Sequence, residues 1–142
     1  MEYSLEKYET YDMWLLMSLH GYKKGCGWED IIHTGDRLNH SIFTWQELNY
    51  GMSKLVFNNW VEITKKGTFK ETEQAKTFIR KHKKFNEDYI SEWLRMSDIL
   101  IKIPAAPDCP YVEYISEEEY NKIVQKYGAW MQKLLNKLYG KR

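Results

Sequence analysis

Apolar and polar positions recur at helical spacing in the first part of the chain. The first apolar run covers residues 11–19, and residues 21–27 then hold three glycines and predict a loop. A second helix is expected to begin near Trp28 and to end at 39–41. Gly35 lies inside this helix, where a missing side chain allows close packing. The pattern thus predicts two helices joined by a glycine-rich loop.

The third predicted helix has the clearest start. Thr44 and Glu47 have the spacing of a capping box, in which each side chain accepts a hydrogen bond from the backbone N–H of the other residue. The apolar positions that follow at helical spacing are Leu48, Met52, Leu55 and Val56. The periodicity then changes. Apolar and polar residues alternate in 60–64, residues 65–67 contain a glycine and predict a turn, and residues 68–70 form a second short alternating run. This change predicts a β-hairpin.

After the hairpin, residues 72–102 predict one long helix. Its large side chains recur at alternating steps of four and three, and they are Phe78, His82, Phe85, Tyr89, Trp93, Met96 and Leu100. Such a seam packs on another helix or on a second copy of the chain. We therefore expect all of these residues except His82 to form a dimer seam. His82 is expected to pack within it, where a buried histidine could tune dimerisation near neutral pH.

The three prolines of the chain all lie in residues 103–110 and end this helix. Ser116 and Glu119 have the spacing of a second capping box, which opens a last helix. The fold class expected from the whole pattern is mainly α with a small β-hairpin (α+β). Residues 1–71 would form the three helices and the hairpin, and residues 72–142 a helical extension that offers a dimerisation region. Periodicity leaves open whether the last two helices fold back on the first part.

Charge adds more to this picture than bulk composition does. The chain has 142 residues, of which 43% are hydrophobic and 15% aromatic, so one compact core is expected. The net charge of +1 favours no class of partner. Residues 61–84, however, hold eight basic and three acidic side chains, whereas residues 28–60 hold two basic and four acidic ones. The excess positive charge therefore lies on the hairpin and just after it.

Residues 12–72 resemble bacterial winged-helix proteins of the MarR/PadR-like type, in which three helices precede a hairpin called the wing. The resemblance is carried by residues 35–48 (GDRLNHSIFTWQEL), by residues 51–55 and by residues 60–63. The local sequence is most similar to that of small uncharacterised bacterial winged-helix proteins. The resemblance implies a winged helix-turn-helix domain over 1–71 and DNA binding, often by dimers joined through flanking helices. It covers a little under half of the chain and is weak evidence for activity, because one fold serves many functions.

Two groups of side chains are candidates for DNA contact. The outward face of the third helix is expected to carry Gln46, Asn49, Tyr50, Ser53 and Lys54. Amide side chains can hydrogen-bond adenine in the major groove, and Tyr or Ser can reach phosphates. The wing would add Lys65, Lys66 and Lys70, and the next helix adds Lys76, Arg80, Lys81, Lys83 and Lys84. For the helix face, the wing and the basic run alike, an ordinary solvated face is the alternative interpretation.

Other chemistry has little support in the sequence. His33, Asp36 and His40 would align on one helix, but no cysteine has fitting spacing, so we expect no metal and a capping or packing role for His40. No catalytic motif and no cofactor motif are found, so we expect neither an enzyme nor a cofactor. Cys26 and Cys109 form no CxxC pair, which favours a reduced protein; a single disulfide between them is the alternative interpretation.

Two functions from different classes follow. The first is a dimeric DNA-binding transcriptional regulator, in which the third helix enters the major groove of double-stranded DNA and the wing contacts phosphate. The second is a winged-helix protein-interaction module without DNA contact, favoured by the acidic balance of residues 28–60; a homodimer or a helical protein would be its partner. The acidic N-terminus and the short apolar run after it predict a cytoplasmic protein without a membrane segment.

Overall fold

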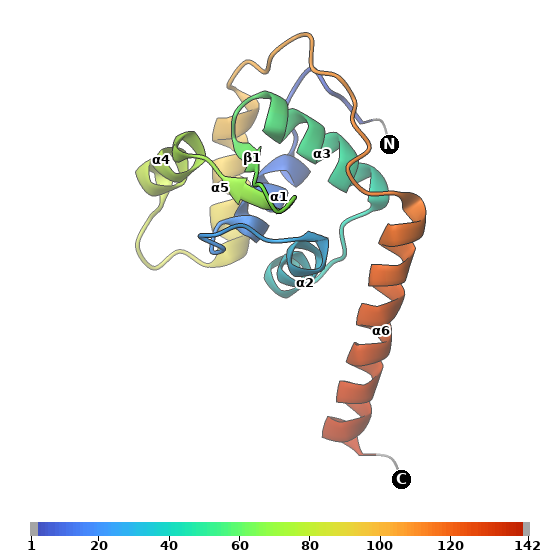
Figure 1. The fold of residues 1–142 in the computed structure, drawn as a ribbon. Helices are drawn as coiled ribbons and strands as arrows, with labels where there is room; N and C mark the ends of the chain where they lie inside the picture. Colours follow the sequence, from blue (N-terminus) through green and yellow to red (C-terminus); the bar gives the residue numbers. More distant parts are fainter. Residues whose placement is uncertain (1–2, 141–142) are drawn as a thin grey trace.

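The computed structural model describes residues 3–140 and is mainly helical, with one two-stranded antiparallel hairpin (Figure 1). The first three helices are α1 (Thr10–Leu19), α2 (Trp28–Asn39) and α3 (Trp45–Phe57). They are followed by β1 (Val61–Ile63) and β2 (Phe69–Glu71). The α+β fold class and this order of elements agree with the sequence prediction.

Hydrogen bonds between side chains and nearby backbone N–H groups fix the first residues of α1 and α3. The Glu9 N–H donates to Asp12 Oδ2 at 2.7 Å, at the start of α1. At α3 the capping box forms in both directions: the Glu47 N–H donates to Thr44 Oγ1 at 3.0 Å, and the Thr44 N–H donates to Glu47 Oε1 at 2.9 Å. These bonds satisfy N–H groups that have no partner within a helix.

The hairpin is held on its second strand by the glycine-rich loop. Val61 pairs with Glu71 and Ile63 with Phe69 across the two strands. On the other edge of β2, Cys26 exchanges two backbone hydrogen bonds of 2.8 Å with Phe69. The loop between α1 and α2 therefore lies beside the hairpin, which brings the end of α1 close to the end of β2.

Helix α1 forms the centre of the core. It packs against α2, α3 and α5 (Tyr89–Ile101), and its side chains are buried around almost its whole circumference. A helix that is apolar all round is expected to be enclosed by its neighbours. The fully buried apolar side chains of α1 are Met13, Leu15, Leu16 and Leu19.

The prediction of a single long helix over 72–102 is wrong. The structure has α4 (Glu73–His82) and α5, which are separated by residues 83–88. Each helix has its own cap, because the Ala75 N–H donates to the Thr72 hydroxyl and the Ser91 N–H to the Asp88 carboxylate. A cap accepts the hydrogen bond of a free helix N–H, so Asp88 starts a new helix where the seam pattern predicts continuation.

The dimer seam predicted on that helix is therefore broken. Phe85 lies in the connecting segment and is 93% exposed, while Met96 and Leu100 are fully buried in the core of the same chain. Phe78 is also buried in this core, and its ring lies 4.7 Å from that of His82. Tyr89 and Trp93 are half-buried against the core. Apart from the exposed Phe85, these residues pack within the chain, so the set presents no continuous surface to a second copy.

One hydrophobic core crosses the domain boundary expected at residue 71. Phe78, Met96 and Leu100 belong to the same cluster as Leu15 and Leu48. The division into 1–71 and 72–142 therefore does not separate two cores. Only α6 (Glu117–Tyr139) stands apart: its first turns contact α2, and the rest extends away from the molecule (Figure 1).

Gly35 is the close-packing point that the sequence suggested. A Cβ atom at this position would lie 2.4 Å from Cε2 of Phe43, a fully buried ring stacked on Trp14 with 3.6 Å between ring centroids. The Trp14 Nε1–H also donates to the Gly35 carbonyl at 3.1 Å. Any side chain here must displace an enclosed ring.

We expect Gly35→Ala to destabilise the protein by about 1–3 kcal/mol, the usual cost of overpacking a core. Gly128→Ala on α6 is the matched control, since nothing lies within 4 Å of its Cβ position; alanine there should stabilise the helix by about 1 kcal/mol or less. Urea denaturation monitored by circular dichroism measures both. Equal unfolding midpoints for Gly35→Ala and the unmodified protein would contradict this packing.

Candidate functional site

The outward face predicted for α3 is wrong at three of its five residues. Asn49, Ser53 and Lys54 are buried. Gln46 is exposed, as expected. Tyr50 is half-buried, with rings of Tyr3 and Tyr111 centred 5.4 and 4.9 Å from its own.

A segment of the same chain covers this face. Residues 103–115, which we call the strap, run beside α3 between the end of α5 and the start of α6 (Figure 1). Asn49 Oδ1 accepts hydrogen bonds from the N–H groups of Tyr114 and Ile115, at 2.8 and 3.0 Å. Its Nδ2 donates to the Ile115 carbonyl at 3.2 Å and to the Trp45 carbonyl at 3.1 Å.

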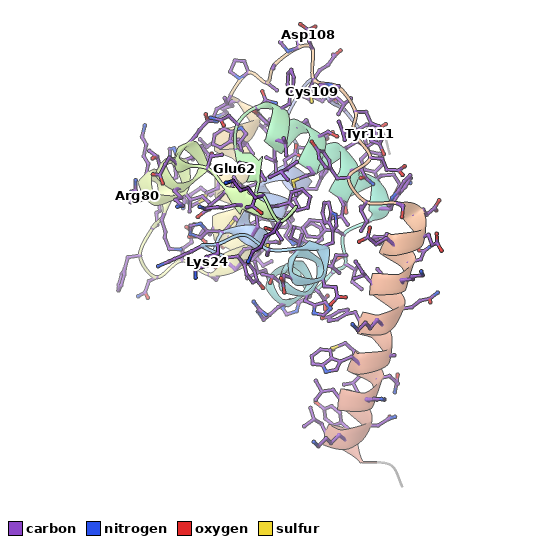
Figure 2. All side chains as sticks on the ribbon, viewed as in Figure 1. Lys24, Glu62, Arg80, Asp108, Cys109 and Tyr111 are labelled. Carbon is purple, nitrogen blue, oxygen red and sulfur yellow. The ribbon has the colours of Figure 1, made fainter. Side chains whose placement is uncertain are left out.

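Further hydrogen bonds fix the strap along the helix. The Val112 N–H donates to Ser53 Oγ at 2.9 Å, and the Ser53 hydroxyl donates to the Val112 carbonyl at 3.0 Å. Near the other end, the Ala106 N–H donates to Asn58 Oδ1 at 2.8 Å. Asp108, Cys109 and Tyr111 lie on this segment, on the side of the molecule away from Lys24 and Arg80 (Figure 2). Of the side chains predicted to read bases, Asn49 and Ser53 are hydrogen-bonded to the strap, while Gln46 stays exposed.

Lys54 is buried for a different reason: it forms an ion pair with Asp12. Its Nζ lies 2.6 Å from Asp12 Oδ2, and both side chains are fully buried. It also donates to the Lys7 carbonyl at 3.0 Å and lies over the Tyr11 ring, 4.7 Å from its centroid. Burial raises the pKa of the Asp12 carboxyl to about 7, although Lys54 and the Glu9 N–H both favour its charged form. Lys54 thus joins α3 to α1 and is not available to a phosphate.

The wing lysines differ in exposure. Lys65 and Lys66 are exposed in the turn of the hairpin. Lys70 is half-buried, and its cross-strand partner is Glu62, so an opposite charge stands beside it on the same face of the hairpin. The exposed positive charge of the wing therefore lies at its turn.

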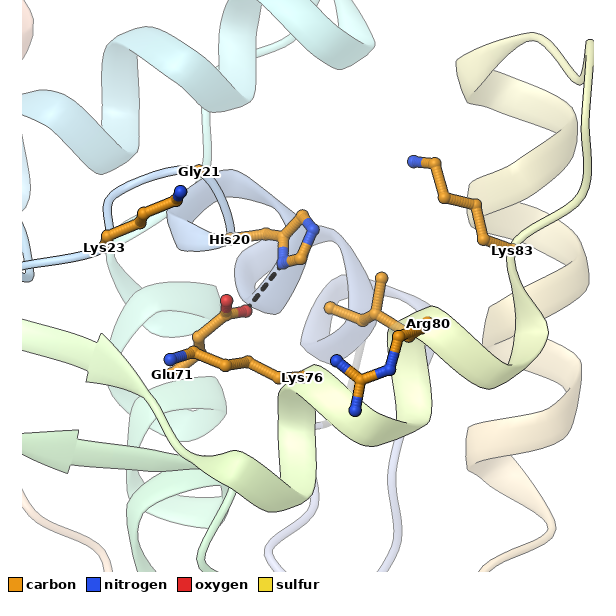
Figure 3. A pocket seen from close by; sticks show the side chains of 8 residues that line it. His20, Gly21, Lys23, Glu71, Lys76, Arg80 and Lys83 are labelled. Atoms are coloured by element: carbon orange, nitrogen blue, oxygen red, sulfur yellow. Dashed lines mark hydrogen bonds and ion pairs between the residues drawn. The ribbon is translucent and has the colours of Figure 1, made fainter.

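The most distinct site is a basic pocket between the end of α1, the end of β2, and α4 (Figure 3). Its volume is about 610 Å³, and its lining residues are His20, Gly21, Lys23, Glu71, Lys76, Ile79, Arg80 and Lys83. Lys76, Arg80 and Lys83 belong to the basic run that the sequence indicated. His20, Lys23 and Glu71 were not among the predicted site residues. Glu71 lies just before α4 in the sequence, whereas His20 and Lys23 are brought to α4 by the pairing of the glycine-rich loop with β2.

A buried acid is paired with a histidine in this pocket. The Glu71 side chain is 4% exposed, and its Oε2 lies 2.7 Å from His20 Nδ1. Figure 3 shows the two groups side by side, between Lys23 and Arg80. Because a carboxylate buried without a partner is costly, the imidazole supplies the hydrogen bond that Glu71 needs.

The histidines of α2 have structural contacts. His40 ends α2 in the left-handed conformation (φ 54°), which fits the capping role expected for it. His33 stacks on Tyr127 of α6, with 4.3 Å between ring centroids, and the Tyr127 hydroxyl donates to Asp36 at 2.5 Å. Within residues 3–140, no group of three or more His, Cys, Asp or Glu side chains is arranged to hold a metal ion. Cys26 and Cys109 are both buried and free.

Comparison with family models, with curated proteins and with solved structures finds no match to this chain. The likeness to winged-helix proteins therefore stays an expectation. Over the described part of the chain, no helix has the length and apolar character needed to cross a bilayer.

We expect Lys54→Met to destabilise the protein more at pH 8 than at pH 5, because the variant must keep Asp12 buried either charged without its counter-ion or protonated, at a cost of about 1.4 kcal/mol for each pH unit above the raised pKa. The raised pKa of Asp12 sets the pH dependence. Below the ordinary pKa of an aspartate, near 4, the carboxyl is protonated in both states and this penalty is absent. The penalty grows as the pH rises through the raised pKa, so the loss should be smaller at pH 5.

Urea denaturation at both pH values measures this difference. Lys133→Met, on the exposed part of α6, is the control and should change stability by less than about 0.5 kcal/mol at either pH. An equal cost of Lys54→Met at the two pH values would show that the ion pair does not control the effect.

Proposed function

We propose that the protein is an interaction module of winged-helix type that self-associates through α6 and does not read DNA bases through α3. The observation that carries this proposal is the uncovered apolar stripe on the distal half of α6. The covered face of α3 supports its second part, since base readout needs side chains that reach the groove.

The stripe continues a surface that is buried nearer to the body of the protein. Ile123 and Tyr127 are buried where α6 contacts α2. About one turn after Tyr127, Trp130 is 53% exposed, and about three turns after it, Leu138 is 65% exposed. Met131 and Leu134 lie between them on the same side of the helix. Helices without tertiary contacts are marginal in water, and exposed apolar patches mark interaction sites. We infer that another surface covers this end of α6.

A second copy of the chain is the partner that we propose. The exposed stripe from Trp130 to Leu138 contains no charged residue on its central line, so two stripes can pack antiparallel about a two-fold axis, with the Trp130 end of each copy against the Leu138 end of the other. Its length is only about two helical turns, which corresponds to a small interface. The proposal therefore implies a weak dimer, populated at high protein concentration.

Sedimentation equilibrium over a concentration series, from micromolar to near-millimolar, tests this proposal. We expect a reversible monomer–dimer equilibrium that Leu134→Glu abolishes, because the change places a charge in the apolar interface. Asn136→Glu is the matched control on the opposite side of α6 and should leave the equilibrium in place, since it adds the same charge outside the stripe. A monomer at every concentration would contradict self-association and leave the stripe to a different protein.

DNA binding by a transcriptional regulator is the second candidate function. The concentration of basic side chains after Trp60 favours it, together with the exposed Lys65 and Lys66 at the wing. With the strap in place, contact would be made to the phosphate backbone and would be nearly independent of sequence. Both candidate functions are compatible with the cytoplasmic location that the sequence predicts.

A titration of duplex DNA across a salt series tests this second function. Each phosphate contact contributes about −0.9 to the slope of log K against log salt. Replacing Lys65, Lys66 and Lys70 by alanine should flatten that slope, whereas Gln46→Ala should leave both affinity and sequence preference unchanged. The absence of binding at micromolar protein and low salt would remove this candidate.

A further inference from the structure

The basic pocket collects positive charge from separate parts of the chain. Lys23 comes from the loop after α1, Lys76 and Arg80 from α4, and Lys83 from the segment that follows α4. A volume of about 610 Å³ lies within the range of small-molecule sites. Like charges that converge on a concave surface raise the local concentration of anions.

The charges of the pocket are only partly balanced by its own acids. Glu71 is the single carboxylate in the lining, and it is already paired with His20. Lys76 lies 3.4 Å from Glu73, whose side chain is 83% exposed, so solvent weakens this ion pair. Within residues 3–140, Lys23 and Arg80 form no ion pair.

Lys83 has an acidic neighbour from a different helix. Its Nζ lies 3.6 Å from Glu92 Oε2, and the lysine side chain is 60% exposed. This pair ties the segment after α4 to α5 and leaves Lys83 at the edge of the pocket (Figure 3). Lys23, Lys76 and Arg80 are therefore the cations best placed to meet an anion.

We propose that this pocket binds a compact phosphate-bearing small molecule. The planar guanidinium of Arg80 can donate two parallel hydrogen bonds to phosphate oxygens, and the lysines supply point charges around them. The buried Ile79 gives the lining an apolar part, against which the organic part of the ligand can pack. A concave site of this size suits a small ligand better than a duplex, which can place only single phosphates at its mouth.

The pair of His20 and Glu71 places one carboxylate among the cations of this site. A free carboxylate among the cations would compete with the ligand for them. The hydrogen bond from the His20 ring holds the Glu71 carboxylate in place and lowers its attraction for the lysines. Glu71 therefore opposes phosphate binding, and removing its charge should increase affinity.

Isothermal titration calorimetry of the full chain with pyrophosphate, at physiological ionic strength, tests the proposal. We expect saturable binding of one pyrophosphate, which Arg80→Ala and Lys76→Ala each weaken roughly tenfold or more. Lys81→Ala, on the same helix but outside the pocket, should change nothing. Glu71→Gln should strengthen binding several-fold, whereas Glu118→Gln on α6, with the same change in net charge, should not.

Three results would overturn the proposal. The first is the absence of saturable pyrophosphate binding. The second is an equal loss in Lys81→Ala and Arg80→Ala, which would mean general charge attraction without a site. The third is duplex DNA binding that depends on Arg80 and Lys76 and that excess pyrophosphate does not displace, which would assign these side chains to a nucleic-acid backbone.

A second measurement uses the unmodified protein, so it does not depend on the folding of any variant. Addition of pyrophosphate should shift the backbone amide resonances of Lys23, Glu71 and Arg80, and resonances of α6 should not move. Shifts spread over the whole surface would contradict a single site. Leu134→Glu should bind pyrophosphate as the unmodified chain does, so failure of self-association and failure of this site are distinguishable.

Discussion

The side-chain amide of Asn49 determines which parts of this protein reach solvent. Its two polar atoms hydrogen-bond the backbone of Tyr114 and Ile115 and fix the end of the strap against α3. Because α6 begins two residues later, at Glu117, the same contact sets where that helix leaves the body. The strap that this amide holds, together with Ser53 and Asn58, covers part of the outer face of α3 and leads into α6, which extends away from the core. The interactions open to the molecule follow from this arrangement.

Electrostatics follow from the same packing. The ion pair with Asp12 places Lys54 between α1 and α3, so α3 has no free cation where base readout would require one. Exposed positive charge remains at the turn of the hairpin and around the pocket beside α4. The surface that could meet an anion and the surface that could meet a second copy are therefore separate parts of the fold. Binding at one does not require the other.

The sequence predicted the local structure well and the tertiary contacts poorly. Thr44 and Glu47 determine the start of α3 through bonds among near neighbours, and Gly35 marks a close contact that only glycine permits. Phe85 was predicted to lie on one long helix because apolar residues at steps of four and three fit one helix or two consecutive helices equally well. The N-cap at Asp88, which starts a second helix, decides between the two. Asn49 and Ser53 were predicted to face solvent because polar residues recur at the same helical positions whether that face of the helix meets water or the backbone of another segment. The pocket requires His20 and Lys23 beside α4, and this placement follows from the pairing of Cys26 with Phe69 and from no local signal.

The strap is a fixed part of the fold and keeps Asn49 and Ser53 of α3 out of solvent. Native-state hydrogen exchange of the Tyr114 and Ile115 amides tests it most directly, because both N–H groups donate to Asn49 Oδ1. This account predicts that they exchange as slowly as the amide of Met52 in the middle of α3, since releasing them requires opening of the core. Exchange as fast as that of Lys84, in the segment between α4 and α5, would contradict it and return α3 to the surfaces available for DNA.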